Sequence, residues 1–117
     1  MSEDSLTGLR DRMRVFTQER DWEQFHDPKS LALALVGEVG EVAELLQWLP
    51  ADEAAKMADQ GPLNARLGEE ISDVLIYLVR LADVCDIHLP EAVARKMESS
   101  EARFPSDQVL GTAPEKG

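Results

Sequence analysis

The stretch LNARLGEEISDVLIYLVRLADVCD, residues 63–86, decides the fold. Its leucines, isoleucines and valines recur at spacings of three and four residues, which is the period of an α-helix. Because the stretch is apolar on almost every side, it should form the most apolar helix of the protein. Gly61 and Pro62 directly precede it and mark where that helix begins.

Three further helices are expected around this stretch. Asp27 followed by Pro28 is typical of a helix start, because the aspartate accepts backbone N–H groups and proline fits the first helical position. Pro50 should end that helix, and Pro90 should open the last one. The expected helices are residues 6 to about 20, capped by Ser5 or Thr7; 28 to about 49; 63–86; and 90 to between 100 and 103, with residues 51–60 as a connector of at most a short turn or two.

The composition favours a single all-α domain. The chain has 117 residues, the usual size of one domain, and aromatic residues make up only 5%. Leucine, alanine and glutamate dominate over β-branched residues, which favours helix over strand. We therefore predict one antiparallel, four-helix, bundle-like domain over residues 1–104. Residues 105–117 contain few large apolar groups and should form a flexible tail.

The net charge of −11 limits the classes of partner. Such an acidic surface repels nucleic-acid backbones, and no basic patch offsets it, so no nucleic-acid partner is expected. The apolar runs at residues 31–36 and 74–79 are too short to cross a bilayer, so no membrane partner is expected either. The single cysteine, Cys85, fits a cytoplasmic protein, and its place in an apolar run predicts a buried side chain.

Two pairs of acids interrupt the apolar faces of the second and third helices. At about 100° per residue, Glu38 shares a stripe with the apolar residues of its helix, and Glu41 lies one turn away. Glu70 likewise lies on an apolar stripe, and Asp73 follows three residues later. All four carboxylates should therefore face the interior.

Four converging carboxylates require a cation, because an unpaired ionised carboxylate out of water is strongly unfavourable. The first of the two helices has no basic residue after Lys29, and the second offers only Arg66 and Arg80, off the shared stripe. Oxygen ligands suit Mg²⁺ or Mn²⁺, and few protein ligands leave positions for water and phosphate oxygens. Gly37 and Gly40 indicate that a ligand or another backbone comes close there.

These acids and their neighbours resemble the motifs of a known family. Glu38-Val39-Gly40-Glu41, followed by Glu69-Glu70-Ile71-Ser72-Asp73, is similar to the E-x-x-E plus E-x-x-D pattern of the all-α MazG-like nucleotide pyrophosphohydrolases. The likeness spans residues 20–105 and looks especially like the dCTP pyrophosphatase branch. It is carried further by RDWEQFH at residues 20–26, Leu89-Pro90, Lys96-Met97 and Arg103-Phe104-Pro105.

The resemblance implies a MazG fold and a nucleoside triphosphate substrate, dCTP or a modified dCTP, which is converted to monophosphate and pyrophosphate to clear the nucleotide pool. It also implies that Mg²⁺ is bound by Glu38, Glu41, Glu70 and Asp73. Aromatic and imidazole groups would surround the base and sugar, and two cations are candidate phosphate contacts. The matching residues here are Trp22, His26, Trp48 and Tyr77 for the nucleoside, and Lys96 and Arg103 for the phosphates.

The expected chemistry is hydrolysis at the α-phosphorus. A water held by metal and a glutamate loses a proton and attacks, pyrophosphate leaves, and Glu38 and Glu41 are the candidate bases. One alternative is a di-iron bundle, although neither His26 nor His88 stands three residues after a core glutamate. The other is a non-catalytic helical dimerisation or binding module, which would bind no metal and release no pyrophosphate.

The helix over residues 63–86 also predicts self-association. Ile71, Leu75 and Leu78 lie outside the Glu70 stripe, so one small subunit cannot easily cover them. We therefore predict a homo-oligomer, and the resemblance implies a dimer or tetramer whose pockets are completed by a neighbouring subunit.

Overall fold

The computed structural model describes residues 5–113, and every regular element in that range is a helix. The predicted all-α class is therefore confirmed. The elements are α1 (Leu6–Glu19), the 3-10 helix η1 (Glu23–Phe25), α2 (Pro28–Leu46), α3 (Ala51–Met57), α4 (Gly61–Val84), α5 (Leu89–Arg103) and α6 (Ser106–Val109).

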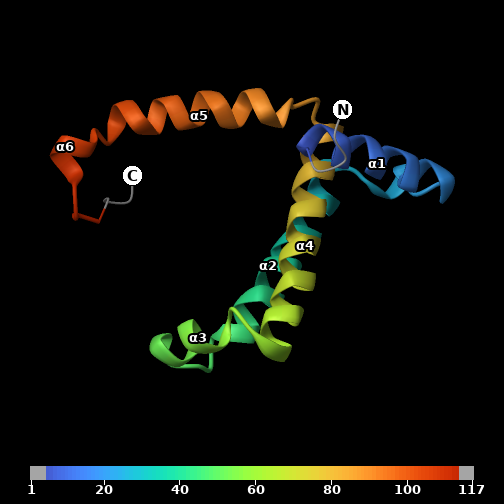
Figure 1. Ribbon diagram of the computed structural model, residues 1–117. Coiled ribbons are helices and arrows are strands. Elements are labelled where there is room, and N and C mark those ends of the chain that lie inside the picture. Colours follow the sequence, from blue (N-terminus) through green and yellow to red (C-terminus); the bar gives the residue numbers. More distant parts are fainter. Residues whose placement is uncertain (1–4, 114–117) are drawn as a thin grey trace.

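The helices α2 and α4 run antiparallel, side by side, and form the framework of the molecule (Figure 1). The short helix α3 connects them at one end, and α1 packs against α4 at the other end. Leu31 of α2 and Leu67 and Val79 of α4 are buried apolar side chains. The longest apolar stretch of the sequence thus lies at the centre of the packing, as its periodicity predicts.

The start of α2 follows the predicted cap. Asp27 Oδ1 accepts a hydrogen bond from the Ser30 backbone N–H at 2.9 Å, and the Ser30 hydroxyl donates to Asp27 Oδ2 at 2.7 Å. The helix ends at Leu46, slightly earlier than the predicted Leu49. The Leu49 N–H instead closes a tighter turn on the Leu46 carbonyl, because the residue before Pro50 avoids the helical conformation.

Three local predictions need correction or extension. Cys85 is exposed, not buried, because α4 ends at Val84 and the chain turns away through Asp86, whose φ is 56°. The connector contains a helix of its own, α3, with Asp52 and Glu53 in the first turn, where negative charge favours a helix. Residues 106–109 of the predicted tail are helical, and the division into domain and tail remains a prediction.

A single chain is open in shape. Its radius of gyration is 17.4 Å, whereas a compact chain of this length has about 13 Å. Helix α5 contacts α1 and then extends away from the α2–α4 pair (Figure 1). Large apolar side chains stay exposed on the framework helices, among them Leu33 and Val36 of α2 and Ile71 and Leu75 of α4. No helix in the described range has the length and apolar character needed to cross a membrane.

Candidate metal centre

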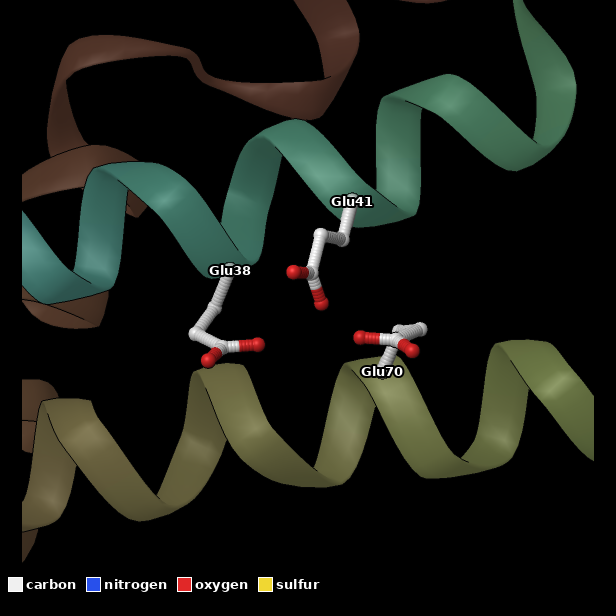
Figure 2. A group of neighbouring side chains, drawn as sticks. All are labelled: Glu38, Glu41 and Glu70. Atoms are coloured by element: carbon white, nitrogen blue, oxygen red, sulfur yellow. The ribbon is translucent and has the colours of Figure 1, made fainter.

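Three of the four predicted acids converge between α2 and α4. Figure 2 shows Glu38 and Glu41 projecting from α2 and Glu70 projecting from α4 into the same space. One carboxylate oxygen from each of the three lies within 4.8 Å of the others. The antiparallel pairing places one turn of each helix opposite the other, so acids from the two parts of the sequence meet.

The environment of Glu38 and Glu70 disfavours the ionised forms of these two glutamates. Glu38 Oε2 and Glu70 Oε2 are both buried and form no hydrogen bond. A hydrogen bond shared with Glu41, then desolvation, then the charges of Glu41, Asp73 and Glu38 raise the pKa of Glu70 to about 7. Desolvation, followed by the charges of Glu41 and Asp73, also raises the pKa of Glu38. The cluster therefore lacks a positive partner.

No lysine or arginine in the described part of the chain forms an ion pair with the four acids. Buried polar atoms are nearly always satisfied in proteins, so the two orphaned glutamate oxygens indicate a missing cationic ligand. An all-oxygen set of this kind fits a hard divalent cation. Glu38, Glu41 and Glu70 would hold it.

Asp73 is exposed and stands outside the group of three. Its charge still acts on Glu38 and Glu70, so it lies near the cluster. It lines a hollow of about 530 Å³ that we call the His26 hollow. Trp22, His26 and Tyr77 line the same hollow, so three of the predicted nucleoside contacts come together beside Asp73.

On the other side of the cluster, Trp48 lines a second hollow, of about 520 Å³, together with Glu41 and Glu70. We call it the Trp48 hollow. Its lining includes Arg66, for which no ion pair is formed within residues 5–113. Arg66 is not among the phosphate contacts that the resemblance implies, which are Lys96 and Arg103. Its position four residues before Glu70, one helical turn, is the signal that could have placed it at the site.

The predicted phosphate contacts on α5 do not join the cluster within one chain. Lys96 and Arg103 line neither hollow, because α5 extends away from α2 and α4 (Figure 1). The guanidinium of Arg103 instead lies 5.0 Å from the ring centre of Phe104. Their role stays a prediction that requires another copy of the chain.

Gly37 and Gly40 of α2 have no close neighbour within the described residues, although glycine at these positions predicts one. A Cβ added at Gly37 or Gly40 would meet nothing within 4 Å. The expected close approach is therefore not made by any part of residues 5–113, and a ligand or a second subunit would have to supply it.

A polar network that no sequence pattern indicates lies beside the His26 hollow. Arg80 Nε donates a hydrogen bond to His26 Nδ1 at 3.0 Å, and Arg80 Nη1 lies 3.4 Å from Asp83 Oδ2. Asp83 in turn accepts two hydrogen bonds from Arg14, at 2.6 and 2.8 Å. His26 and Arg80 are far apart in the sequence, so no local spacing could reveal their contact.

Comparison with known proteins agrees with this arrangement. Residues 26–106 match the family model of the MazG nucleotide pyrophosphohydrolase domain. The chain is 50% identical to dCTP pyrophosphatase 1 of Bos taurus over 112 residues, covering 96% of this chain and 66% of the relative. It is also 50% identical to dCTP pyrophosphatase 1 of Homo sapiens over 104 residues, covering 89% and 61%. The chain thus spans just under two thirds of the length of these curated relatives.

A solved structure is similar as well. The crystal structure of a pyrophosphatase from Archaeoglobus fulgidus superposes with a TM-score of 0.78 at 40% sequence identity. The likeness covers 86% of this chain and 92% of that one, so it extends well beyond the acid motifs.

Proposed function

The chain belongs to the MazG nucleotide pyrophosphohydrolase family, and from this premise we propose that it hydrolyses dCTP, or a modified dCTP, to the monophosphate and pyrophosphate. Its relatives named dCTP pyrophosphatase 1 support this choice of substrate. We further propose that Mg²⁺ is the metal, with Mn²⁺ as a substitute, and that the enzyme clears nucleotides in the cytoplasm.

One observation carries the proposal: three glutamates converge, and two of their oxygens are buried without a partner. Two of the glutamates line the Trp48 hollow, and the nearby Asp73 lines the His26 hollow. A structural metal would be enclosed by protein ligands, whereas Glu41 and Glu70 of this cluster line the open Trp48 hollow. Such a position lets a bound ion reach phosphate oxygens while the nucleoside lies in a hollow. Bound there, Mg²⁺ would neutralise phosphate charge and lower the pKa of a neighbouring water.

The residues of the chain accept the proton of the attacking water and bind the base. Glu38 or Glu41 accepts the proton of the attacking water, whose oxygen forms a bond to the α-phosphorus. The bond from that phosphorus to the bridging oxygen breaks, and pyrophosphate carries the electron pair away. The rings of Trp22 and Tyr77 offer stacking surfaces for the base in the His26 hollow.

The test is pyrophosphate release from a panel of canonical and modified nucleoside triphosphates, with and without Mg²⁺. We expect turnover of dCTP only with the metal, and a loss of about 100-fold or more in kcat for Glu38→Gln and Glu41→Gln. Glu69→Gln is the matched control, because Glu69 is exposed on α4 beside Glu70 but stands outside the cluster.

The control should keep normal turnover. Near-normal rates in both cluster variants would remove the proposed role of Glu38 and Glu41. Absence of pyrophosphate release from every triphosphate, together with no Mg²⁺ binding by calorimetry, would favour the alternative of a non-catalytic helical binding module.

A further inference from the structure

Arg80 is a buried cation at the wall of the His26 hollow. Only 8% of the residue is exposed, although arginine is rarely buried without partners. Its Nε–H donates to His26 Nδ1, and its Nη1 group lies beside Asp83. Because Asp83 is held in turn by two hydrogen bonds from Arg14, the guanidinium is fixed from the side opposite His26.

This contact decides which nitrogen of His26 carries the proton. A guanidinium has only donors and stays charged at any ordinary pH, so His26 Nδ1 must be the unprotonated acceptor. A neutral imidazole with a bare Nδ1 carries its proton on Nε2. Adding a proton to Nδ1 would set two N–H groups and two positive charges against each other.

The surroundings of His26 also favour the neutral imidazole. Desolvation, followed by the charge of Arg80, lowers the pKa of His26, and only Glu23 opposes this. The other charged or titratable side chains that line the hollow are Arg12, Asp73 and Tyr77. The Nε2 atom forms no hydrogen bond with residues 5–113, so its N–H remains for a molecule in the hollow.

We propose that Arg80 is a positioning residue, which fixes His26 as a hydrogen-bond donor to an acceptor atom of the bound nucleoside. This inference rests on the proposed function and adds a specificity device to it. The acceptor is a base carbonyl, a ring nitrogen with a lone pair, or a sugar oxygen. Because Nδ1 is occupied, the imidazole cannot exchange its two roles. A nucleoside with an N–H at that position would place its own donor against the His26 Nε2–H donor, and the nucleoside would bind more weakly.

Nitrogen-15 NMR of the imidazole rings tests the tautomer directly in the Mg²⁺-loaded protein near neutral pH. The chain has only two histidines, and the exposed His88 serves as an internal reference. We expect His26 to carry its proton on Nε2 only. In Arg80→Met, which removes both donor and charge, His26 should become a mixture of tautomers.

Two further variants separate the hydrogen bond from other effects. In Arg80→Gln, the amide nitrogen follows Cδ as Nε does in arginine, so a neutral donor is restored and the Nε2–H tautomer should persist. In Arg12→Met, a cation that lines the same hollow without bonding to His26 is lost, and the tautomer should not change. A proton on Nδ1 in the unmodified protein would overturn the proposal, and so would a mixture in Arg80→Gln that matches Arg80→Met.

The kinetic consequence is a change in KM and not in kcat. We expect Arg80→Met to raise KM for dCTP by about 3- to 10-fold, the value of one neutral hydrogen bond, while kcat stays close to normal and Arg80→Gln recovers most of the loss. Equal KM values in an active unmodified enzyme and in Arg80→Met would overturn the inference.

An enzyme inactive on every triphosphate would overturn the proposed function, and the NMR result would still decide the role of Arg80. If Arg80→Met fails to fold, the NMR spectra of the unmodified protein and Arg80→Gln decide it.

Discussion

At the scale of single residues, the unusual feature is the proton affinity of Glu70. Its oxygen Oε2 is buried without a partner, and its neighbours are other acids. A hydrogen bond with Glu41, then desolvation and the neighbouring acids, raises the pKa of Glu70 from the ordinary value of 4.5 to about 7. A divalent cation would reverse this preference, because it favours the ionised carboxylate.

The stability of the metal-free protein should reflect this shift. Below pH 4.5 Glu70 is protonated in both states, and between 4.5 and about 7 only the unfolded state releases its proton. The contribution of Glu70 therefore makes folding less favourable as the pH rises through that window. We expect the Tm in EDTA to fall there, less steeply in Glu70→Gln, and Mg²⁺ above pH 7 to raise the Tm of the unmodified protein more than that of the variant.

Thermal unfolding across the pH range, with EDTA or Mg²⁺, measures both effects. Parallel pH profiles for the two proteins in EDTA would contradict the assigned environment of Glu70. An equal gain from Mg²⁺ in both would contradict its role as a metal ligand.

At the scale of elements, a single ion pair connects α1 to the end of α4. Arg14 donates to both carboxylate oxygens of Asp83, whose side chain is only 11% exposed, whereas that of Arg14 is 46% exposed. The hydrogen bond from Arg14 lowers the pKa of Asp83 more than burial raises it. The pair therefore stabilises the folded state wherever Asp83 is ionised.

Asp83→Asn should lower the free energy of unfolding by about 1 kcal/mol at neutral pH, a value reduced because Arg14 is half exposed. The deficit should disappear as the pH falls below the ordinary carboxyl range, because the unmodified Asp83 is then protonated as well. Urea denaturation at two pH values measures this. Asp11→Asn is the control, since the ion pairs of Asp11 with Arg10 and Arg14 both stay within α1 and do not reach α4. Equal stability of the two variants would contradict the connection.

The elements also show what can be predicted from the sequence. The Asp27 cap and the apolar stripe that carries Glu38 are local patterns, so the start of α2 and the inward position of its first acid could be predicted. The contact of Arg80 with His26 depends on how α4 packs against the segment before α2, so it cannot be predicted from the spacing of residues within one helix. For the same reason the exposure of Cys85 was missed, because it depends on where α4 ends.

At the scale of the whole molecule, the exposed apolar faces of α2 and α4 call for a partner. Val36 is 67% exposed and Ile71 is 54% exposed, and both belong to the helices that carry the acids. Exposed apolar surface on this scale is typical of interfaces between subunits. A second copy at these faces would also come close to the open sides of Gly37 and Gly40.

We therefore expect a dimer or tetramer at micromolar concentration, and a smaller species for the double variant Val36→Glu and Ile71→Glu, because charge at the interface would have to be desolvated. Sedimentation velocity measures the assembly state. Met57→Glu is the control, since Met57 is exposed on α3 and belongs to neither framework helix. A monomeric unmodified protein, or a double variant that sediments like it, would contradict the prediction.

The order of the helices along the chain has a consequence for biosynthesis. Helices α2, α3 and α4 are consecutive, so the three glutamates can meet as soon as this hairpin has left the ribosome, through contacts of short sequence separation that form quickly. Helix α5 emerges later, and within residues 5–113 it packs mainly against α1. We therefore expect the three glutamates to reach their final arrangement within one nascent polypeptide, and helix α5 to reach its own later, against other copies of the chain in the predicted oligomer.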